Sequence, residues 1–183
     1  MGEICHTFGM ELRRGLPELE ELLALPPAVA LSYVITLDGQ LVGPDGSSRS
    51  LSSDIDLELL RRLRASADVI VVGKRTAEIE RYTAITVRPE FVARRVAAGL
   101  TEHPALVVVD RSGPALADIV AQHGTRVALE AGPQLVHAFT NDISRVWLSQ
   151  GPPRATWCDR GCDAVELPAA HGGLEAGTNS RRW

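Results

Sequence analysis

The sequence lacks an excess of basic residues and lacks any long apolar run. Nineteen Lys and Arg stand against 23 Asp and Glu, which gives a formal net charge of -4. General nucleic-acid binders usually carry a basic excess or stripe. No apolar run approaches the roughly 20 residues needed to cross a bilayer, and the first residues do not have the charged-then-apolar order of a signal peptide. We therefore expect a cytoplasmic protein that binds neither nucleic acid nor a membrane.

Cysteine is also scarce, and the motifs of several catalytic classes are missing. Cys5, Cys158 and Cys162 are an odd number without an export signal, which argues against a disulfide framework. The spacing of Cys158, Cys162 and His171 fits no standard zinc pattern, so we predict no metal site. Gly-x-Ser-x-Gly, His-Glu-x-x-His and Cys-x-x-Cys are absent. These absences disfavour hydrolase and thiol-redox mechanisms, whereas a reductase needs little machinery because its cofactor carries the hydride.

The residues that are present have the balance of a globular domain. Of the 183 residues, 45% are hydrophobic and 23% are charged. This length suits one domain with a sizeable core, and no repeat or linker divides the chain. We assign residues 1–27 to a polar or weakly helical N-terminal extension, with a short helix within 16–27, and residues 28–183 to a single domain.

Apolar, β-branched runs alternate with helix signals along this domain. Buried strands are expected over 28–36, 68–73, 105–110 and 125–130, with further strands over 144–150 and 163–169. Helices are expected over 52–67, 74–82, 89–100, 113–124 and 132–140. This order predicts an α/β fold with a central, mostly parallel sheet and helices on both faces. Ligands of such sheets lie beyond the carboxyl ends of the strands.

Two strand-to-helix turns at this edge combine glycine with backbone amides that are free to bind an anion. They are residues 73–76 (Gly-Lys-Arg-Thr) and 132–135 (Gly-Pro-Gln-Leu). Glycine permits a tight turn and close approach, and helix N-termini attract phosphate. Either turn alone could be an ordinary connection. Together they predict that the amides following Gly73 and Gly132 converge on one diphosphate, as in a dinucleotide.

Polar residues near these turns are candidates for chemistry. Glu130 precedes the second turn and would accept a hydrogen bond from a hydroxyl, amine or ring N–H, unless it is an exposed strand-end acid. Arg111 and Ser112 suit the extra phosphate of NADP, or form a surface turn. Asp38 is a candidate catalytic residue beside Glu130, although Asp-Gly pairs such as Asp38 and Gly39 usually form β-turns.

The order of four segments resembles the reductase domain of bacterial riboflavin biosynthesis. They are VITLDGQLVG, SLSSDIDLELLRRLRASADVIVVGKRTAEIERY, ALVVVDRSG and RVALEAGPQLVHAF, and the resemblance runs from about residue 28 to 150. It is particularly close to stand-alone actinobacterial members regarded as pyrimidine reductases. The resemblance implies a dihydrofolate reductase-like three-layer fold, NADPH as cofactor, a homodimer, and hydride transfer to C1 of the ribosyl group of a small pyrimidine substrate.

The resemblance also implies roles for individual residues. The cofactor would contact Val34, Ser50, Thr76, Glu80, Ser112, Gly132, Pro133, Gln134 and Leu135. The phosphorylated ribosyl-pyrimidine would be held by Ser48, Arg64, Arg88 and Glu130. The candidate catalytic residues are Asp38 and Glu130.

Departures from the family pattern leave other hypotheses open. Between VVVDRSG and RVALEAGP the chain has only one helix, where the family normally has an additional strand and helix that help enclose the adenine. Ser50 replaces a family aromatic residue, and Glu-Ala-Gly-Pro replaces Glu-Gly-Gly-Pro. The alternatives are a diverged member that has lost or weakened NADPH binding and performs a non-redox step or binds a small ligand, and an inactive partner subunit. Trp147, Trp157 and Trp183 would supply a dimer surface or close the core.

Overall fold

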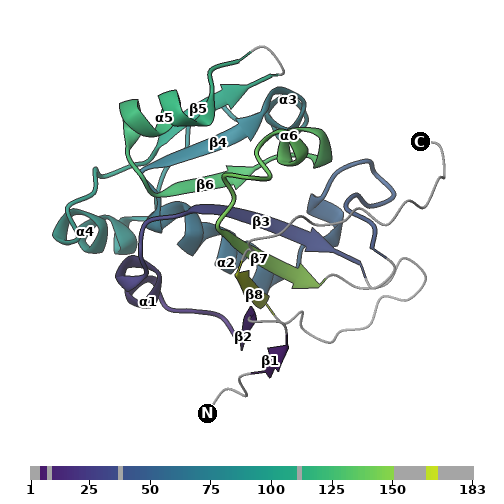
Figure 1. Cartoon of the computed structure of the whole chain (residues 1–183), viewed down its shortest axis with the longest axis horizontal. Helices are drawn as coiled ribbons and strands as arrows, with labels where there is room; N and C mark the ends of the chain where they lie inside the picture. Colours follow the sequence, from purple (N-terminus) through teal and green to yellow (C-terminus); the bar gives the residue numbers. More distant parts are fainter. Residues whose placement is uncertain (1–4, 8–9, 37–38, 111–112, 151–163, 169–183) are drawn as a thin grey trace.

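The protein folds around one twisted sheet, and Figure 1 shows its strands from β1 to β5 across the width of the sheet. The computed structural model describes residues 5–7, 10–36, 39–110, 113–150 and 164–168. Five neighbouring strands are parallel, in the order β7 (Arg145–Gln150), β3 (Val29–Ile35), β6 (Val127–Glu130), β4 (Val69–Gly73) and β5 (Ala105–Val109). The predicted α/β class with a mostly parallel sheet is therefore confirmed.

Three antiparallel strands extend the sheet beyond β7. β8 (Ala164–Pro168) pairs with β7, and β2 (Met10–Arg14) pairs with β8 and with β1 (Cys5–Thr7). The strand over 163–169 was expected, but the description of the first residues as polar or weakly helical was wrong for 5–7 and 10–14. These strands have no clear apolar alternation. β1 pairs with the nearby β2, and β2 joins the sheet through a partner more than 150 positions away along the chain, as in Arg13↔Glu166.

Helices cover both faces of the sheet, as the alternation predicted. On one face lie α5 (Leu116–His123) and α6 (Pro133–Ala138), which share an apolar cluster with Leu31, Val71 and Leu129. The other face carries α1 (Leu19–Ala24), α2 (Asp54–Ser66) and α4 (Pro89–Ala97), which contact one another, while α3 (Lys74–Glu80) packs against β4 and β5. Three-layer packing buries the central strands β4 and β6 on both sides, which explains their nearly continuous apolar sequences.

Local signals account for the position of α2, the helix that carries Arg64. Ser53 accepts a hydrogen bond from the backbone N–H of Asp56 at 3.2 Å, and two acids occupy the first turn. Leu59 and Leu63 pack against Trp147 of β7, which is 4% exposed. Trp147 therefore closes the core, which is one of the two roles considered for the tryptophans. Trp157 and Trp183 lie outside the described residues.

A single helix, α5, connects β5 to β6, as the sequence indicated. β5 is consequently the last strand of the sheet on this side within the described part of the chain, and its Val108 is 47% exposed. None of the helices in the described ranges is long and apolar enough to cross a membrane.

Candidate functional site

The two predicted anion turns lie side by side at the carboxyl edge of the sheet. β4 and β6 are hydrogen-bonded neighbours in parallel register, with Val72 opposite Glu130, so the chain leaves both strands at the same level. A Cβ placed on Gly73 would lie 3.7 Å from a methyl carbon of Leu135 and 3.7 Å from the hydroxyl of Thr76. The start of α6 therefore touches the start of α3, and neither turn faces the opposite edge of the molecule.

The two glycines differ from the prediction in their conformation. Gly73 has φ -66° and Gly132 has φ -68°, values that any residue adopts, so neither turn depends on the conformational freedom of glycine. At Gly132, room for a ligand explains the presence of glycine better than backbone conformation does. A Cβ built there would meet no heavy atom of the described chain within 4 Å, and a glycine at this point leaves room for a ligand against the backbone.

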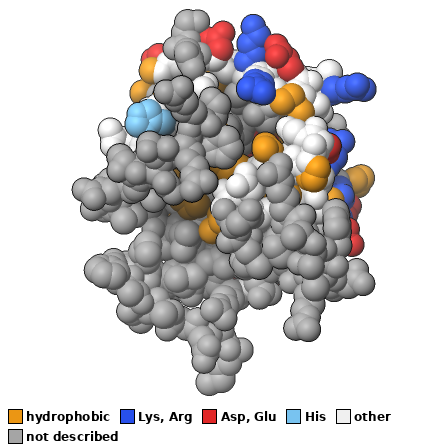
Figure 2. Space-filling view, turned by 90° about the vertical axis from the view of Figure 1, so that its right-hand side faces the viewer, with side chains coloured by type: hydrophobic (Ala, Val, Ile, Leu, Met, Phe, Trp, Pro, Cys, Tyr) orange, Lys and Arg blue, Asp and Glu red, His pale blue; other side chains and the backbone are white. Residues whose placement is uncertain are grey.

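Figure 2 faces the carboxyl edge and shows Lys and Arg side chains at its upper part, interspersed with Asp and Glu side chains. Lys74 and Arg75 of α3, and Arg81 directly after it, are exposed. Arg49, in the 3-10 turn η1 (Arg49–Leu51), pairs with Glu80 of α3 at 2.8 Å. An anionic ligand at the two turns would lie among these cations.

The loop between β3 and α2 is brought beside α3 by the Arg49–Glu80 ion pair. It carries Ser48, which is exposed, and Ser50, whose hydroxyl donates to Asp45 Oδ1 at 2.6 Å and holds the pKa of Asp45 below its usual range. The cofactor role of Ser50 and the substrate role of Ser48 stay predictions.

A buried polar group occupies the face of the sheet that α2 covers. Arg64 of α2 binds Glu130 through two hydrogen bonds, Nε to Oε1 at 2.7 Å and Nη2 to Oε2 at 2.6 Å. Arg64 Nη2 also donates to the hydroxyl of Tyr82, which donates to Glu130 Oε2 at 3.0 Å. Glu130 is only 8% exposed, so the alternative of an exposed strand-end acid was wrong.

The contacts of this group shift the pKa values of Arg64 and Tyr82 in the directions that keep Arg64 charged and Tyr82 neutral. Burial disfavours the Arg64 cation, but the hydrogen bonds and negative charge of Glu130 outweigh burial and raise the pKa of Arg64. Burial, followed by the Glu130 charge, raises the pKa of Tyr82 well above its usual value. The Arg64 guanidinium also lies over the Tyr82 ring, 4.9 Å from its centroid. The group is a bidentate ion pair with a protonated tyrosine attached to it.

Arg88, the other cation predicted to bind the substrate, belongs to a different cluster. Its Nη2 binds Glu58 of α2 at 2.6 Å and 2.9 Å, and its guanidinium lies 4.5 Å from the centroid of Phe91. Burial works against the Glu58 carboxylate, but Arg62 and Arg88 outweigh it and lower the Glu58 pKa. No contact in the described chain joins Arg88 to Arg64 or Glu130, so its substrate role stays a prediction.

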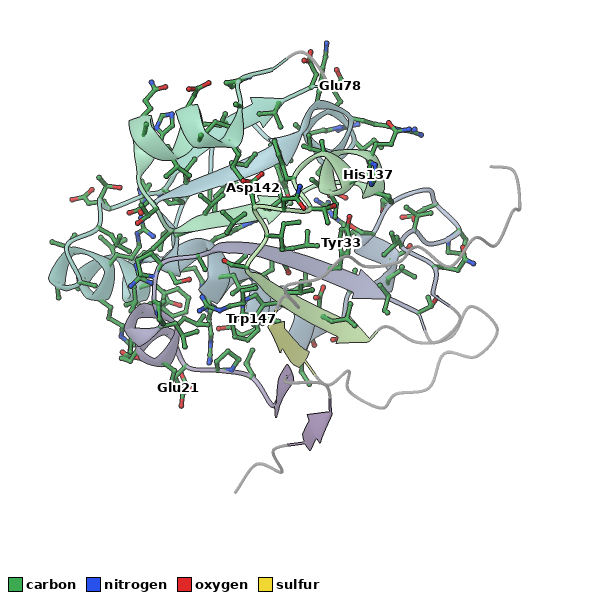
Figure 3. The ribbon with its side chains drawn as sticks, in the orientation of Figure 1. Glu21, Tyr33, Glu78, His137, Asp142 and Trp147 are labelled. Atoms are coloured by element: carbon green, nitrogen blue, oxygen red, sulfur yellow. The ribbon has the colours of Figure 1, made fainter. Side chains whose placement is uncertain are left out.

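Tyr33 and Val34 of β3 face opposite sides of the sheet. Tyr33 packs in the cluster of α5 and α6, and its hydroxyl donates to the carbonyl oxygen of Ala131 at 2.7 Å. Figure 3 shows Tyr33 on β3 and His137 on the neighbouring α6. Val34 is buried and, by strand alternation, faces the same side as Glu130. The residue expected near the nicotinamide therefore shares a sheet face with the residue expected to hold the substrate.

A narrow hollow runs between α2 and this sheet face. Its wall includes Ser32 and Glu130 at one end and Arg126 and Arg145 near the amino ends of the strands at the other, with Leu60 of α2 above it. The hollow thus reaches the Arg64–Glu130 pair from beneath α2. It is lined mainly by apolar side chains, and its volume of about 30 Å³ is that of a single water molecule.

Some predicted residues cannot be placed in this arrangement. Asp38, Arg111 and Ser112 lie outside the described residues, as do Cys158, Cys162 and His171. Within the ranges that are described, no group of His, Cys, Asp or Glu could hold a metal ion.

The two tyrosines of the site were missed by the sequence reasoning. Tyr82 binds a carboxylate 48 positions away and Tyr33 binds a carbonyl 98 positions away, so no local spacing links either to its partner. The signal that could have identified them is the rarity of tyrosine in the sequence. The chain has only two tyrosines, and a buried hydroxyl needs a hydrogen-bond partner.

Comparison with known proteins places this geometry in a family context. The family model described as the RibD C-terminal domain matches residues 27–127. No curated protein sequence matches the chain.

Solved structures share the fold at low sequence identity. A pyrimidine reductase-like protein from Corynebacterium diphtheriae has a TM-score of 0.67 at 16% identity, over 83% of this chain and 98% of that one. The diaminohydroxyphosphoribosylaminopyrimidine deaminase/5-amino-6-(5-phosphoribosylamino)uracil reductase of Thermotoga maritima has a TM-score of 0.57 at 15% identity, over 79% of this chain and 57% of that protein. RibD from Acinetobacter baumannii has a TM-score of 0.52 at 13% identity, over 79% of this chain and 58% of that protein. The chain thus spans little more than half the length of the last two proteins.

Proposed function

Because this chain belongs to the RibD C-terminal domain family, we propose that it is an NADPH-dependent reductase of a (ribosylamino)pyrimidine or a related heterocyclic metabolite. The observation that supports this most directly is that an open turn and a buried ion pair lie next to each other. The open turn at Gly132 is continuous in sequence with Glu130, whose carboxylate forms the buried ion pair on the other side of the strand tip. A cofactor at the turn and a substrate at the ion pair would therefore meet at the end of β6.

The cofactor half of the cleft fits a dinucleotide in three respects. The two turns are in contact, Gly132 leaves space beside the backbone, and exposed cations surround α3. Thr76, Glu80 and residues 132–135 would hold NADPH, with Val34 near the nicotinamide, and Ser50 and Ser112 as further contacts. NADPH would supply the hydride that converts the ribosyl group of the substrate to a ribityl chain.

The substrate would bind at the buried polar group under α2, which consists of Arg64, Tyr82 and Glu130. Glu130 would accept a hydrogen bond from an N–H or O–H of the substrate, and Arg64 orients this carboxylate through two hydrogen bonds. Ser48 and Arg88 would contact the phosphorylated ribosyl group, and Asp38 is retained as a candidate catalytic acid. A homodimer is also part of this proposal, as is a cytoplasmic location.

A second candidate function is supported by the short connection between β5 and β6. Only α5 lies there, and the outer edge of β5 has no partner strand in the described part of the chain. A weakly enclosed adenine would reduce NADPH affinity, and the cleft would then serve a non-redox step or bind a small ligand. An inactive partner subunit is the third possibility, and it predicts a stable hetero-complex in pull-downs.

Titration with NADPH, followed by cofactor fluorescence, tests the leading proposal. We expect saturable binding, and we expect Gly132→Val to weaken it by at least tenfold, about 1.4 kcal/mol, because the side chain fills the space for the ligand. The backbone at Gly132 accepts valine without strain, so the variant should fold.

Ala98→Val is a matched control, since Ala98 is exposed after α4 and precedes β5, at the opposite edge of the sheet. It should bind NADPH like the unaltered protein. Absence of NADPH binding at millimolar concentration would overturn the reductase proposal. Equal binding by Gly132→Val and Ala98→Val would remove the cofactor from this turn.

A further inference from the structure

We infer that Tyr33 and Tyr82 are positioning residues that fix the tip of β6 from opposite faces of the sheet, Tyr33 for the nucleotide and Tyr82 for the substrate. This inference rests on the proposed function. Its starting point is that the only two tyrosines of the chain bond to consecutive residues, Ala131 and Glu130.

Tyr33 acts on the turn through the backbone. Its hydroxyl donates to the carbonyl oxygen of Ala131 at 2.7 Å, and Ala131 itself is buried in the cluster of α5 and α6. The peptide unit between Ala131 and Gly132 is planar and trans, so fixing its carbonyl also fixes the opposed N–H of Gly132. Tyr33 thereby sets the direction of the first amide of the turn and the direction in which α6 leaves the strand.

The contacts of Tyr33 also connect the turn to the helix that follows. Its ring packs in the cluster that contains Leu135 and Val136 of α6. The ring therefore supports α6 by packing, while the hydroxyl orients the preceding peptide. Removing only the hydroxyl separates these two contributions.

Tyr82 acts on the carboxylate of Glu130. Glu130 Oε2 receives hydrogen bonds from Arg64 Nη2 and from the Tyr82 hydroxyl, whereas Oε1 receives one from Arg64 Nε. A carboxylate oxygen has two lone-pair positions, so Oε2 is filled and Oε1 keeps one acceptor position among the described residues. Tyr82 thus determines which oxygen of Glu130 remains available, and that oxygen suits an N–H or O–H donor of a substrate.

The backbone around Tyr82 is held in an unusual conformation. Arg81, just before it, has φ 56°, the only positive φ of a non-glycine residue in the described ranges. The N–H of Tyr82 donates to the carbonyl of Ala77 at 2.9 Å, which closes the end of α3. This termination turns the chain so that the Tyr82 ring lies against the Arg64 guanidinium.

Both hydroxyls are suited to act as donors at neutral pH. Burial raises the pKa of Tyr33, and burial together with the Glu130 charge raises that of Tyr82. Both hydrogen bonds are therefore present throughout the range in which a cytoplasmic enzyme works.

The test uses Tyr33→Phe and Tyr82→Phe, which keep the rings and serve as controls for each other. NADPH affinity is measured by fluorescence, and the affinity of 5-amino-6-(5-phosphoribosylamino)uracil, the compound in the name of the Thermotoga protein, by calorimetry. We expect Tyr33→Phe to weaken NADPH roughly three- to tenfold with little change for the pyrimidine, and Tyr82→Phe to weaken the pyrimidine roughly tenfold with little change for NADPH.

Two measurements without ligand separate this inference from the proposed function. Tyr33→Phe should speed amide hydrogen exchange at Leu135 and Val136, whose N–H groups donate to the carbonyl oxygen of Gly132, and Tyr82→Phe should speed exchange of the Arg64 Nε–H proton, each without the other effect. If the unaltered protein binds neither ligand but the exchange changes appear, the function fails and the positioning roles stand. Equal losses for both ligands in both variants, or unchanged exchange, would overturn the positioning roles.

Discussion

Glu130 shows how a single residue can have two roles at the end of a strand. Its carboxylate is buried and bound by a cation and a tyrosine hydroxyl, yet its backbone leads directly into the open turn at Gly132. The ion pair has the geometry in which Arg is strongest, with two parallel N–H···O hydrogen bonds. A substrate donor would therefore meet a carboxylate that is already fixed in position.

Glu130→Gln is expected to destabilise the fold as well as alter the site. The variant leaves the Arg64 cation beside a neutral amide in a mostly buried position. Complete burial would cost about 3–5 kcal/mol, and because the Arg64 side chain is 19% exposed we expect about 2–3 kcal/mol, measured by urea unfolding.

Glu90→Gln is the matched control for this prediction. Glu90 pairs with Arg88 at 3.1 Å but its side chain is 55% exposed, so its loss should cost less than about 1 kcal/mol. Equal effects of the two substitutions would contradict the importance of burial at Glu130.

At the scale of elements, α2 is held in place by a residue of another helix. Arg95 of α4 is fully buried, and its Nη1 donates to the carbonyl oxygens of Ala65 at 2.6 Å and Ala67 at 2.8 Å. A third donation reaches the carbonyl of Arg64 at 3.3 Å. A cation at a helix C-terminus satisfies free carbonyls and complements the helix dipole. Arg95 therefore fixes the end of α2 that carries Arg64.

Arg95→Met should destabilise the protein by about 3 kcal/mol, because several buried carbonyl groups lose their donor at once. Thermal and urea unfolding would measure the change. Arg94→Met, one position earlier on the same helix, is the control. Arg94 makes an exposed ion pair with Glu20 at 3.1 Å, so its replacement should cost less than about 1 kcal/mol.

At the scale of the whole molecule, the two tyrosines predict loss of stability at alkaline pH. Burial raises the pKa of both in the folded protein, whereas an unfolded tyrosine ionises near pH 10. The native state then binds more protons than the unfolded state, so stability is complete below about pH 10 and falls as the pH rises beyond it. The slope should be at most about 1.4 kcal/mol per pH unit for each tyrosine.

Melting temperatures between pH 8 and pH 11 would check this dependence. The double variant Tyr33→Phe, Tyr82→Phe should be less stable at pH 8 but should lose less stability between pH 9.5 and 11 than the unaltered protein. Parallel curves for the two proteins would show that other groups cause the alkaline loss.

The sequence by itself determined the order and type of most elements of the sheet. Continuous apolar runs predict buried strands wherever they occur, and capping residues such as Ser53 place helix starts, because both signals are local. The positions of the two turns followed from strand ends and glycines in the same way.

Only the tertiary structure decided which of these residues meet. Arg64 and Glu130 are 66 positions apart, and Tyr33 and Ala131 are 98 apart, so their contacts depend on β6 entering the sheet between β3 and β4. The strands at 5–7 and 10–14, the burial of Trp147 and the paired state of Glu130 depend on the same long-range packing. Periodicity and capping describe a segment's own geometry, whereas the partner of a buried polar group is set by which segments the sheet brings together.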